Sequence, residues 1–200
     1  QADCMAMTWN YKQFQLPFLQ SACYNLQSIN GNVAGEFPVF YFLAAKFSDT
    51  EFALRLIHTI IFLSGILSVY FISFYFLERT LLSIFCALLI FTSPLLVFYG
   101  NNFLSDVPAL SFALIGWAFF LSNYKNEKLF WILISFLCFS MAALLKASEA
   151  IHFVLLFLFL IRFRSQKSKI NLFFVFVLSA WLLVLGWYIY AKHYNKLNHD

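Results

Sequence analysis

Charged residues are scarce in this chain of 200 residues. Asp, Glu, Lys and Arg make up 11% of it, against about 25% in a typical soluble domain. Hydrophobic residues make up 62%, with 28 Phe among them, and the mean hydropathy is +0.79. A water-soluble globule must cover its surface with polar groups and cannot hide so much apolar side chain. The composition therefore excludes a soluble enzyme, a disordered chain and a nucleic-acid binder, and it indicates an integral membrane protein.

Several signals of chemistry and processing are also missing. No His, Cys and Asp cluster has the spacing of metal ligands, and no Gly-rich phosphate loop or nucleophile elbow occurs. Of the four cysteines, Cys86 and Cys138 lie in apolar runs, while Cys4 and Cys23 would pair only in an oxidising compartment, so we expect free thiols. No signal peptide opens the chain, and its last residue closely follows an apolar run. We expect a fragment of a longer protein, truncated at both ends.

Long apolar runs stand where the charges are missing. A membrane-spanning helix needs about 20 mostly apolar residues. Segments that meet or approach this length are 52–77, 81–99, 107–123, 129–146, 149–163 and 170–191. The run 129–163 is too long for one span, so we expect a turn at Lys146-Ala147-Ser148. The sequence therefore predicts an all-α, polytopic transmembrane helix bundle over residues 51–191.

The rest of the chain is more polar. Residues 1–50 mix apolar residues with Asn, Gln, Ser and Gly, which is typical of interfacial helices. Residues 192–200 would begin a second segment outside the membrane. Positive charge is concentrated in the loops 78–79, 125–128 and 162–169, which hold seven Lys or Arg and two acids. The positive-inside rule makes these loops cytoplasmic and places 1–50, 100–107 and 146–149 on the outer face.

Three carboxylates are expected on that outer face. Asp3 lies near the start of the chain, and its alternative interpretation is an exposed residue without a role. Glu36 and Asp106 each stand just before a predicted helix, so either could simply cap that helix, since carboxylates favour helix N-termini. If the three are functional, we expect them to face one cavity.

Two basic residues are expected at the same face. Arg55 lies at a membrane boundary and could extend its side chain to lipid headgroups. Lys146 ends an apolar helix and could do the same, or pair with Glu149 three residues on. We expect His58 and His152 to be ordinary interior histidines. Ionisable residues close to a membrane are costly and are therefore functional candidates.

The order of short motifs along the chain resembles that of family 39 glycosyltransferases of the GT-C membrane fold. This superfamily includes the protein O-mannosyltransferases and the lipid A aminoarabinose transferases. The resemblance covers nearly the whole chain, and its individual motifs are short and degenerate. The matching stretches are Gln1-Ala2-Asp3, Gly35-Glu36-Phe37-Pro38-Val39-Phe40-Tyr41, Phe52-Ala53-Leu54-Arg55-Leu56, Leu104-Ser105-Asp106-Val107-Pro108-Ala109-Leu110 and Leu144-Leu145-Lys146-Ala147.

The resemblance implies a membrane glycosyltransferase that uses a polyprenyl-phosphate sugar donor. Asp3 best matches the catalytic carboxylate of the first outer loop, and Asp106 matches a second acid facing the same cavity. Lys146 matches a lysine near the donor phosphate. The acid of that loop in the aminoarabinose transferases stands a few positions earlier than Asp3. They also carry Lys where this chain has Phe37, so one phosphate contact is absent.

Transfer chemistry is consistent with these residue types. A carboxylate can deprotonate an acceptor hydroxyl or amine as general base, with Glu36 as the next candidate after Asp3. Lys146 or Arg55 could stabilise the charge that builds on the departing phosphate. One displacement step would invert the anomeric centre. The acceptor would be a lipid, a glycan or a protein.

No cofactor is certain, and a divalent cation stays open. We expect a multi-pass protein of the bacterial inner membrane with its active site outside.

A polytopic transporter or lipid flippase is the alternative function. Transporters place charges or broken helices near the bilayer midplane. Here the predicted spans are almost free of acids and bases at mid-depth, and the charges gather at one face. This distribution favours an interfacial enzyme.

Overall fold

The chain folds into helices packed side by side, in a computed structural model that describes residues 2–24, 28–124, 129–162 and 167–198. Over these ranges there is no β-strand, and the only β-type pairing is an isolated bridge between Ala22 and Asn32. The predicted all-α class is therefore confirmed.

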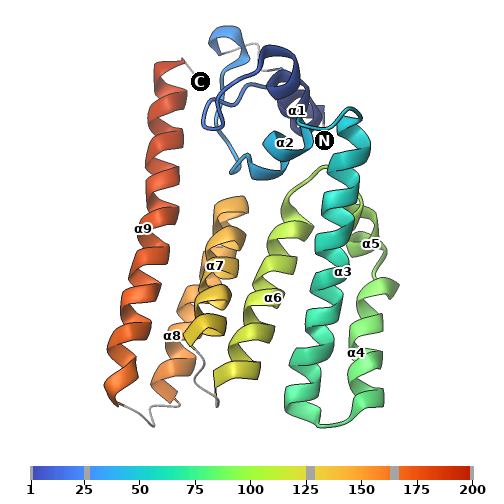
Figure 1. Cartoon of the computed structure of the whole chain (residues 1–200), viewed down its shortest axis with the longest axis vertical. Coiled ribbons are helices and arrows are strands. Elements are labelled where there is room, and N and C mark those ends of the chain that lie inside the picture. The colour runs from blue at the N-terminus through green and yellow to red at the C-terminus, as the bar shows by residue number, and fades with distance from the viewer. Residues whose placement is uncertain (1, 25–27, 125–128, 163–166, 199–200) are drawn as a thin grey trace.

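Long helices form the body of the molecule (Figure 1). They are α3 (Thr50–Leu77), α4 (Thr80–Thr92), α6 (Asp106–Tyr124), α7 (Leu129–Leu145), α8 (Ile151–Arg162) and α9 (Lys167–Leu197). The remaining helices connect or cover them: α1 (Ala2–Phe14), η1 (Ile29–Gly31), α2 (Val39–Ala44), α5 (Pro94–Gly100) and η2 (Ala147–Ala150).

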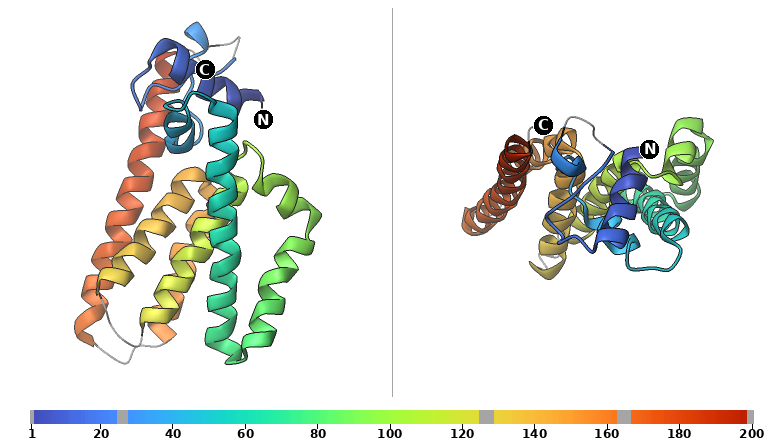
Figure 2. Two further views of the ribbon diagram at one scale, coloured as in Figure 1. Left: turned by 45° about the vertical axis from the view of Figure 1, so that its right-hand side comes forward. Right: turned by 90° about the horizontal axis from the view of Figure 1, so that it is seen from above.

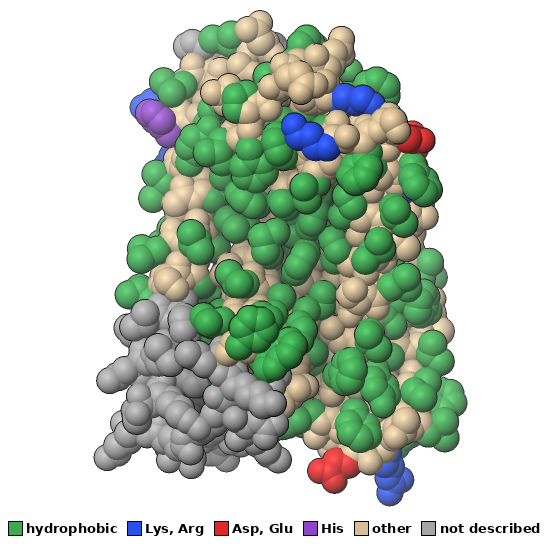
Figure 3. All heavy atoms as spheres, viewed as in Figure 1, with side chains coloured by type: hydrophobic (Ala, Val, Ile, Leu, Met, Phe, Trp, Pro, Cys, Tyr) green, Lys and Arg blue, Asp and Glu red, His purple; other side chains and the backbone are tan. Residues whose placement is uncertain are grey.

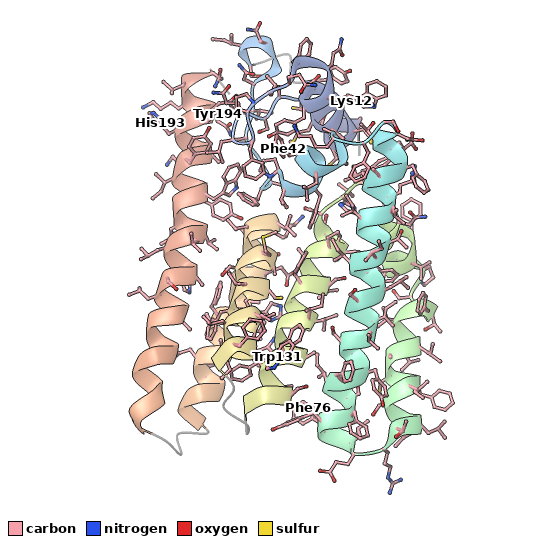
Figure 4. All side chains as sticks on the ribbon, in the orientation of Figure 1. Lys12, Phe42, Phe76, Trp131, His193 and Tyr194 are labelled. Carbon is pink, nitrogen blue, oxygen red and sulfur yellow. The ribbon has the colours of Figure 1, made fainter. Side chains whose placement is uncertain are left out.

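Residues 2–24 and 28–49 cover one end of this bundle, which we call the capped end (Figures 1 and 2). The C-terminal part of α9 reaches the same end and is bonded to this cover. The backbone N–H of Ile29 donates to the Asn198 carbonyl at 3.0 Å, and that of Ala34 donates to Asn195 Oδ1 at 2.7 Å. In Figure 4 the labelled side chains of Lys12, Phe42, His193 and Tyr194 all lie at this end. Chain segments far apart in sequence therefore meet there.

On the face seen in Figure 3, the described side chains along the helices are mostly apolar. Large exposed side chains on α3 and α4 include Phe71, Phe74, Leu81, Phe85 and Leu89. Among the described residues one helix, Thr50–Leu77, is long and apolar enough by itself to cross a bilayer. The pair α4 and α5 would be a second if the two count as one bent span, and Asp106–Ser122, Phe130–Leu145 and Ala147–Leu158 are shorter apolar helices.

The structure differs from the predicted span 81–99, which is broken between α4 and α5. The two helices meet at Ser93 and Pro94 with a bend of 74°. Pro94 has no backbone N–H and fits the start of a helix, and a residue before proline avoids helical backbone. Ser93 is accordingly extended, with φ −78° and ψ 106°. Hydropathy does not register this break because the residues around it stay apolar.

The expected turn near residue 146 is present. Lys146 leaves the helical conformation, with φ −144° and ψ 118°, and η2 and α8 follow it. Its backbone N–H still donates to the Ala142 carbonyl at 2.9 Å, so the regular hydrogen bonding of α7 continues up to the residue at which the chain turns. This places Lys146 at the junction of α7 and η2, beside the start of α6.

Candidate functional site

An ion pair between Lys146 and Asp106 forms the centre of the candidate site. Asp106 is the first residue of α6, and its Oδ1 lies 2.5 Å from Lys146 Nζ. The two side chains are 45% and 42% exposed, so the pair is open to solvent or a ligand. The bond to Asp106 raises the pKa of Lys146, and the nearby carboxylates of Glu36 and Glu149 act in the same direction. Lys146 is therefore a firmly charged cation among acids.

Glu36 lies near this pair, because the backbone N–H of Phe37 donates to the Leu144 carbonyl at 3.4 Å, and its side chain is held by Tyr41. The Tyr41 hydroxyl lies 2.7 Å from Glu36 Oε2, 3.3 Å from Cys4 Sγ and 3.4 Å from the Phe103 carbonyl oxygen. Tyr41 is only 1% exposed. Burial, followed by the charge of Glu36, raises the pKa of Tyr41 well above its ordinary value. The phenol therefore stays protonated and acts as a hydrogen-bond donor.

The helix-cap interpretation of Glu36 is wrong. The N-cap residue of α2 is Pro38, which makes no side-chain capping bond. Glu36 instead accepts the hydrogen bond from Tyr41, a residue inside the helix that it was expected to cap. The pairing of Lys146 with Glu149 is also wrong, because Lys146 bonds Asp106 and Glu149 lies 2.9 Å from His152 Nε2.

Asp3 is exposed in the first turn of α1. No hydrogen bond or ion pair fixes its carboxylate within the part of the chain that the structure describes. Its neighbour Cys4 is buried and contacts Tyr41. Burial raises the pKa of the Cys4 thiol, and the carboxylates of Glu36 and Asp3 add to that rise. Asp3 therefore belongs to the same end of the molecule as Glu36.

Arg55 has a separate set of partners. Its guanidinium lies 3.0 Å from Glu51 Oε1, donates to the Asn101 carbonyl at 3.1 Å, and stands 4.4 Å from the centre of the Phe103 ring. Among the described contacts none joins Arg55 to Lys146 or Asp106. The structure thus groups Lys146, Asp106 and Glu36, while Arg55 contacts the 101–103 loop, whose Phe103 carbonyl lies 3.4 Å from the Tyr41 hydroxyl.

Two histidines are interior residues. His58 is fully buried and its Nδ1 lies 2.6 Å from the Asn102 carbonyl, while its Nε2 has no partner among the described residues. The Trp117 indole N–H donates to His152 Nδ1 at 3.0 Å, and His152 Nε2 lies 2.9 Å from Glu149. This Trp117–His152–Glu149 chain and the role of Tyr41 were not predicted. The only sequence signal was the spacing of Glu149 and His152.

Metal binding has no assembled donor set in the described ranges. No group of three or more His, Cys, Asp or Glu side chains there could hold a metal ion. Comparison with known proteins adds no assignment, since no family model, no curated protein and no solved structure matches the chain.

Proposed function

We propose that this protein is a membrane glycosyltransferase that moves a sugar from a polyprenyl-phosphate donor to an acceptor. The observation that carries the proposal is the half-exposed Lys146–Asp106 pair with Glu36 beside it. It combines a cation for a phosphate with carboxylates for an acceptor at one end of an apolar bundle. The resemblance to family 39 glycosyltransferases supports the same chemistry.

The bundle would stand in the bilayer as a polytopic protein, with its capped end on the outer face. The apolar exterior of the helices and the long helix α3 support membrane insertion. The distribution of Lys and Arg supports the orientation, because basic loops favour the cytoplasm. A bacterial inner membrane is the proposed location. The donor's lipid tail would then lie among apolar helices, with its phosphate at the level of Lys146.

In the proposed reaction a carboxylate removes a proton from the acceptor hydroxyl or amine. Asp3 is the first candidate for this general base, and Glu36 is the second. The acceptor oxygen or nitrogen forms a bond to the anomeric carbon while the bond from that carbon to the phosphate oxygen breaks. The polyprenyl phosphate leaves with the electron pair, and the ammonium group of Lys146 stabilises its charge. Asp106 holds Lys146 until the phosphate arrives.

The test is sugar transfer by the complete polypeptide in liposomes, with a labelled polyprenyl-phosphate sugar. Asp3→Asn should lower turnover about 10²–10⁴-fold if Asp3 is the base. Lys146→Met keeps the apolar stem and should weaken donor binding and slow transfer. Asp49→Asn is the matched control, because Asp49 only caps α3 through the Phe52 N–H at 3.0 Å and Asn caps equally well. Normal transfer by both Asp3→Asn and Lys146→Met would contradict the proposed site.

A transporter or lipid flippase is the second candidate, favoured by one observation. The apolar run of α4 and α5 is broken by 74°, and broken helices are a feature of transporter sites. The two functions separate in the same liposomes. A transporter moves the labelled donor across the bilayer and leaves its sugar–phosphate bond intact, whereas a transferase releases the polyprenyl phosphate.

A further inference from the structure

The Tyr41 hydroxyl has three neighbours but only one proton to donate. Glu36 Oε2 is the nearest at 2.7 Å, while Cys4 Sγ and the Phe103 carbonyl lie at 3.3 Å and 3.4 Å. A hydrogen bond to a carboxylate is shorter and about twice as strong as one between neutral groups. The proton therefore goes to Glu36. Cys4 Sγ, at 3.3 Å, is then left as a second neighbour of the Tyr41 oxygen, to which its S–H can donate because a thiol is a weak donor as well as a weak acceptor.

The surroundings keep this chain in one arrangement. Tyr41 and Cys4 both belong to the buried core formed by α1, α2, α3 and the start of α6, and they are 1% and 8% exposed. Water has little access to the hydroxyl, and the low local dielectric strengthens its bond to a charge. Glu36 itself is only half-buried. A rigid buried donor thus holds a carboxylate that lies at the surface.

Each carboxylate of the site is restrained differently. Asp106 is engaged by Lys146. Asp3 is exposed, and no described bond restrains it. Glu36 is bonded through Oε2, and no described bond occupies its Oε1. Glu36 and Asp106 each keep one oxygen that no described bond occupies, but Asp106 is engaged by the half-exposed Lys146, whereas Glu36 is held by the buried Tyr41.

We propose that Tyr41 is a positioning residue that holds Glu36 for the acceptor, with Cys4 orienting Tyr41. The proposal rests on the proposed glycosyltransferase function. Tyr41 keeps Oε2, and Oε1 accepts a hydrogen bond from the acceptor hydroxyl or amine. The backbone N–H of Phe37, the residue after Glu36, donates to the carbonyl of Leu144, two residues before Lys146, at 3.4 Å, so the held carboxylate places the acceptor near the donor phosphate. No bond to Tyr41 forms or breaks in the reaction.

The test compares two buried tyrosines that differ in what they bond. Tyr41→Phe removes the donor to Glu36. Tyr11→Phe is the matched control, because Tyr11 is 3% exposed, lies in the same core and donates to the Phe18 carbonyl at 2.7 Å. We expect Tyr41→Phe to raise the KM for the acceptor at least tenfold, since a bond to a charged group is lost. The KM for the donor should change less than twofold, and Tyr11→Phe should change neither.

A second measurement does not depend on activity. Melting temperatures of Tyr41→Phe, Glu36→Gln and the double variant should be non-additive, with Tyr41→Phe costing less in the Glu36→Gln background. Tyr11→Phe should cost the same in both backgrounds. Additive effects of Tyr41→Phe and Glu36→Gln would overturn the proposal even in an active enzyme, as would an unchanged acceptor KM in Tyr41→Phe.

If Tyr41→Phe does not fold, a less disruptive substitution tests the same proposal. Cys4→Ala removes the thiol that orients Tyr41, and it should raise the acceptor KM about threefold, as expected for loss of one neutral hydrogen bond. An unchanged acceptor KM would then overturn the proposal. If the unaltered protein transfers no sugar, the proposed function fails and the positioning role fails with it. If only the positioning role is wrong, the unaltered protein still transfers sugar, and the changes in melting temperature caused by Tyr41→Phe and Glu36→Gln are additive.

Discussion

Gly65 on α3 packs closely against Ser111 on α6, so it offers a sharp test of the packing that positions Arg55 and Asp106. A Cβ placed on Gly65 would lie 2.7 Å from Ser111 Oγ, 2.8 Å from Ser111 Cβ and 3.1 Å from Ser111 Cα. The last contact involves backbone, so a rotamer change at Ser111 cannot relieve it and the helices must separate. Overpacking of this kind costs about 1–3 kcal/mol, while replacing Gly by Ala in a helix gains up to about 1 kcal/mol. We expect Gly65→Ala to lower the free energy of unfolding by about 0–3 kcal/mol.

Gly186 provides the matched control for this experiment. It also lies within a helix, α9, and a Cβ there would meet nothing within 4 Å. Gly186→Ala should therefore be stabilising by up to about 1 kcal/mol, and the two variants should differ by about 1–3 kcal/mol. Unfolding in mixed micelles, followed by circular dichroism, measures both. Adding Ser111→Gly to Gly65→Ala should recover part of the loss. Equal stabilisation by Gly65→Ala and Gly186→Ala would refute the packing argument.

Two further predictions concern the polar contacts near the capped end. The pKa of Lys146 is raised above 10.5 by Asp106, so the pair stabilises the fold below that pH and the contribution is lost as pH rises through the raised pKa. Lys146→Met should lower the free energy of unfolding by about 0.2–1 kcal/mol, as expected for so exposed a pair. This loss should become smaller in alkaline buffer, and a loss that does not change with pH would contradict the prediction. Because an indole can only donate, ¹⁵N NMR should find the proton of neutral His152 on Nε2, facing Glu149. In Trp117→Phe a second tautomer of His152 should appear. If His152 keeps the same single tautomer in this variant, Trp117 does not select the tautomer.

The helices of the body could largely be predicted, because each long apolar run needs a helix to satisfy its backbone. The turn at Lys146 followed from length alone, since the run 129–163 exceeds one span. The break at Ser93 was missed for a physical reason. Hydropathy sums side chains and ignores backbone donors, so Pro94 does not interrupt an apolar run although it begins a new helix.

The candidate site could be predicted only in part. Asp106 and Lys146 are 40 positions apart, and each stands at the end of an apolar run on what the loops indicated to be one face. Their ionic contact follows from that topology. The role of Tyr41 does not follow from that topology. In a sequence, an aromatic residue within an apolar helix looks like any other core residue, and only the structure shows which group its hydroxyl bonds. The contact with Cys4 depends on how residues 2–24 and 28–49 fold over the bundle, which hydrophobic periodicity does not specify.

The geometry also ranks the two cations proposed for the donor phosphate. Arg55 would have to give up the ion pair to Glu51, the bond to the Asn101 carbonyl and the contact with Phe103. Lys146 has one described side-chain bond, to Asp106, and that pair is half exposed. Surface pairs of this kind are worth about 0–1 kcal/mol, so the singly charged phosphodiester of the donor can displace the Asp106 carboxylate, and the polyprenyl phosphate released by transfer, a monoester with up to two charges, competes more strongly. Asp106 would then separate from Lys146 as the phosphate binds. If Lys146 alone holds the phosphate, the Asp106→Asn variant should bind the donor at least as tightly as the unaltered protein does. Weaker donor binding by Asp106→Asn would mean that Asp106 keeps Lys146 in place during binding as well.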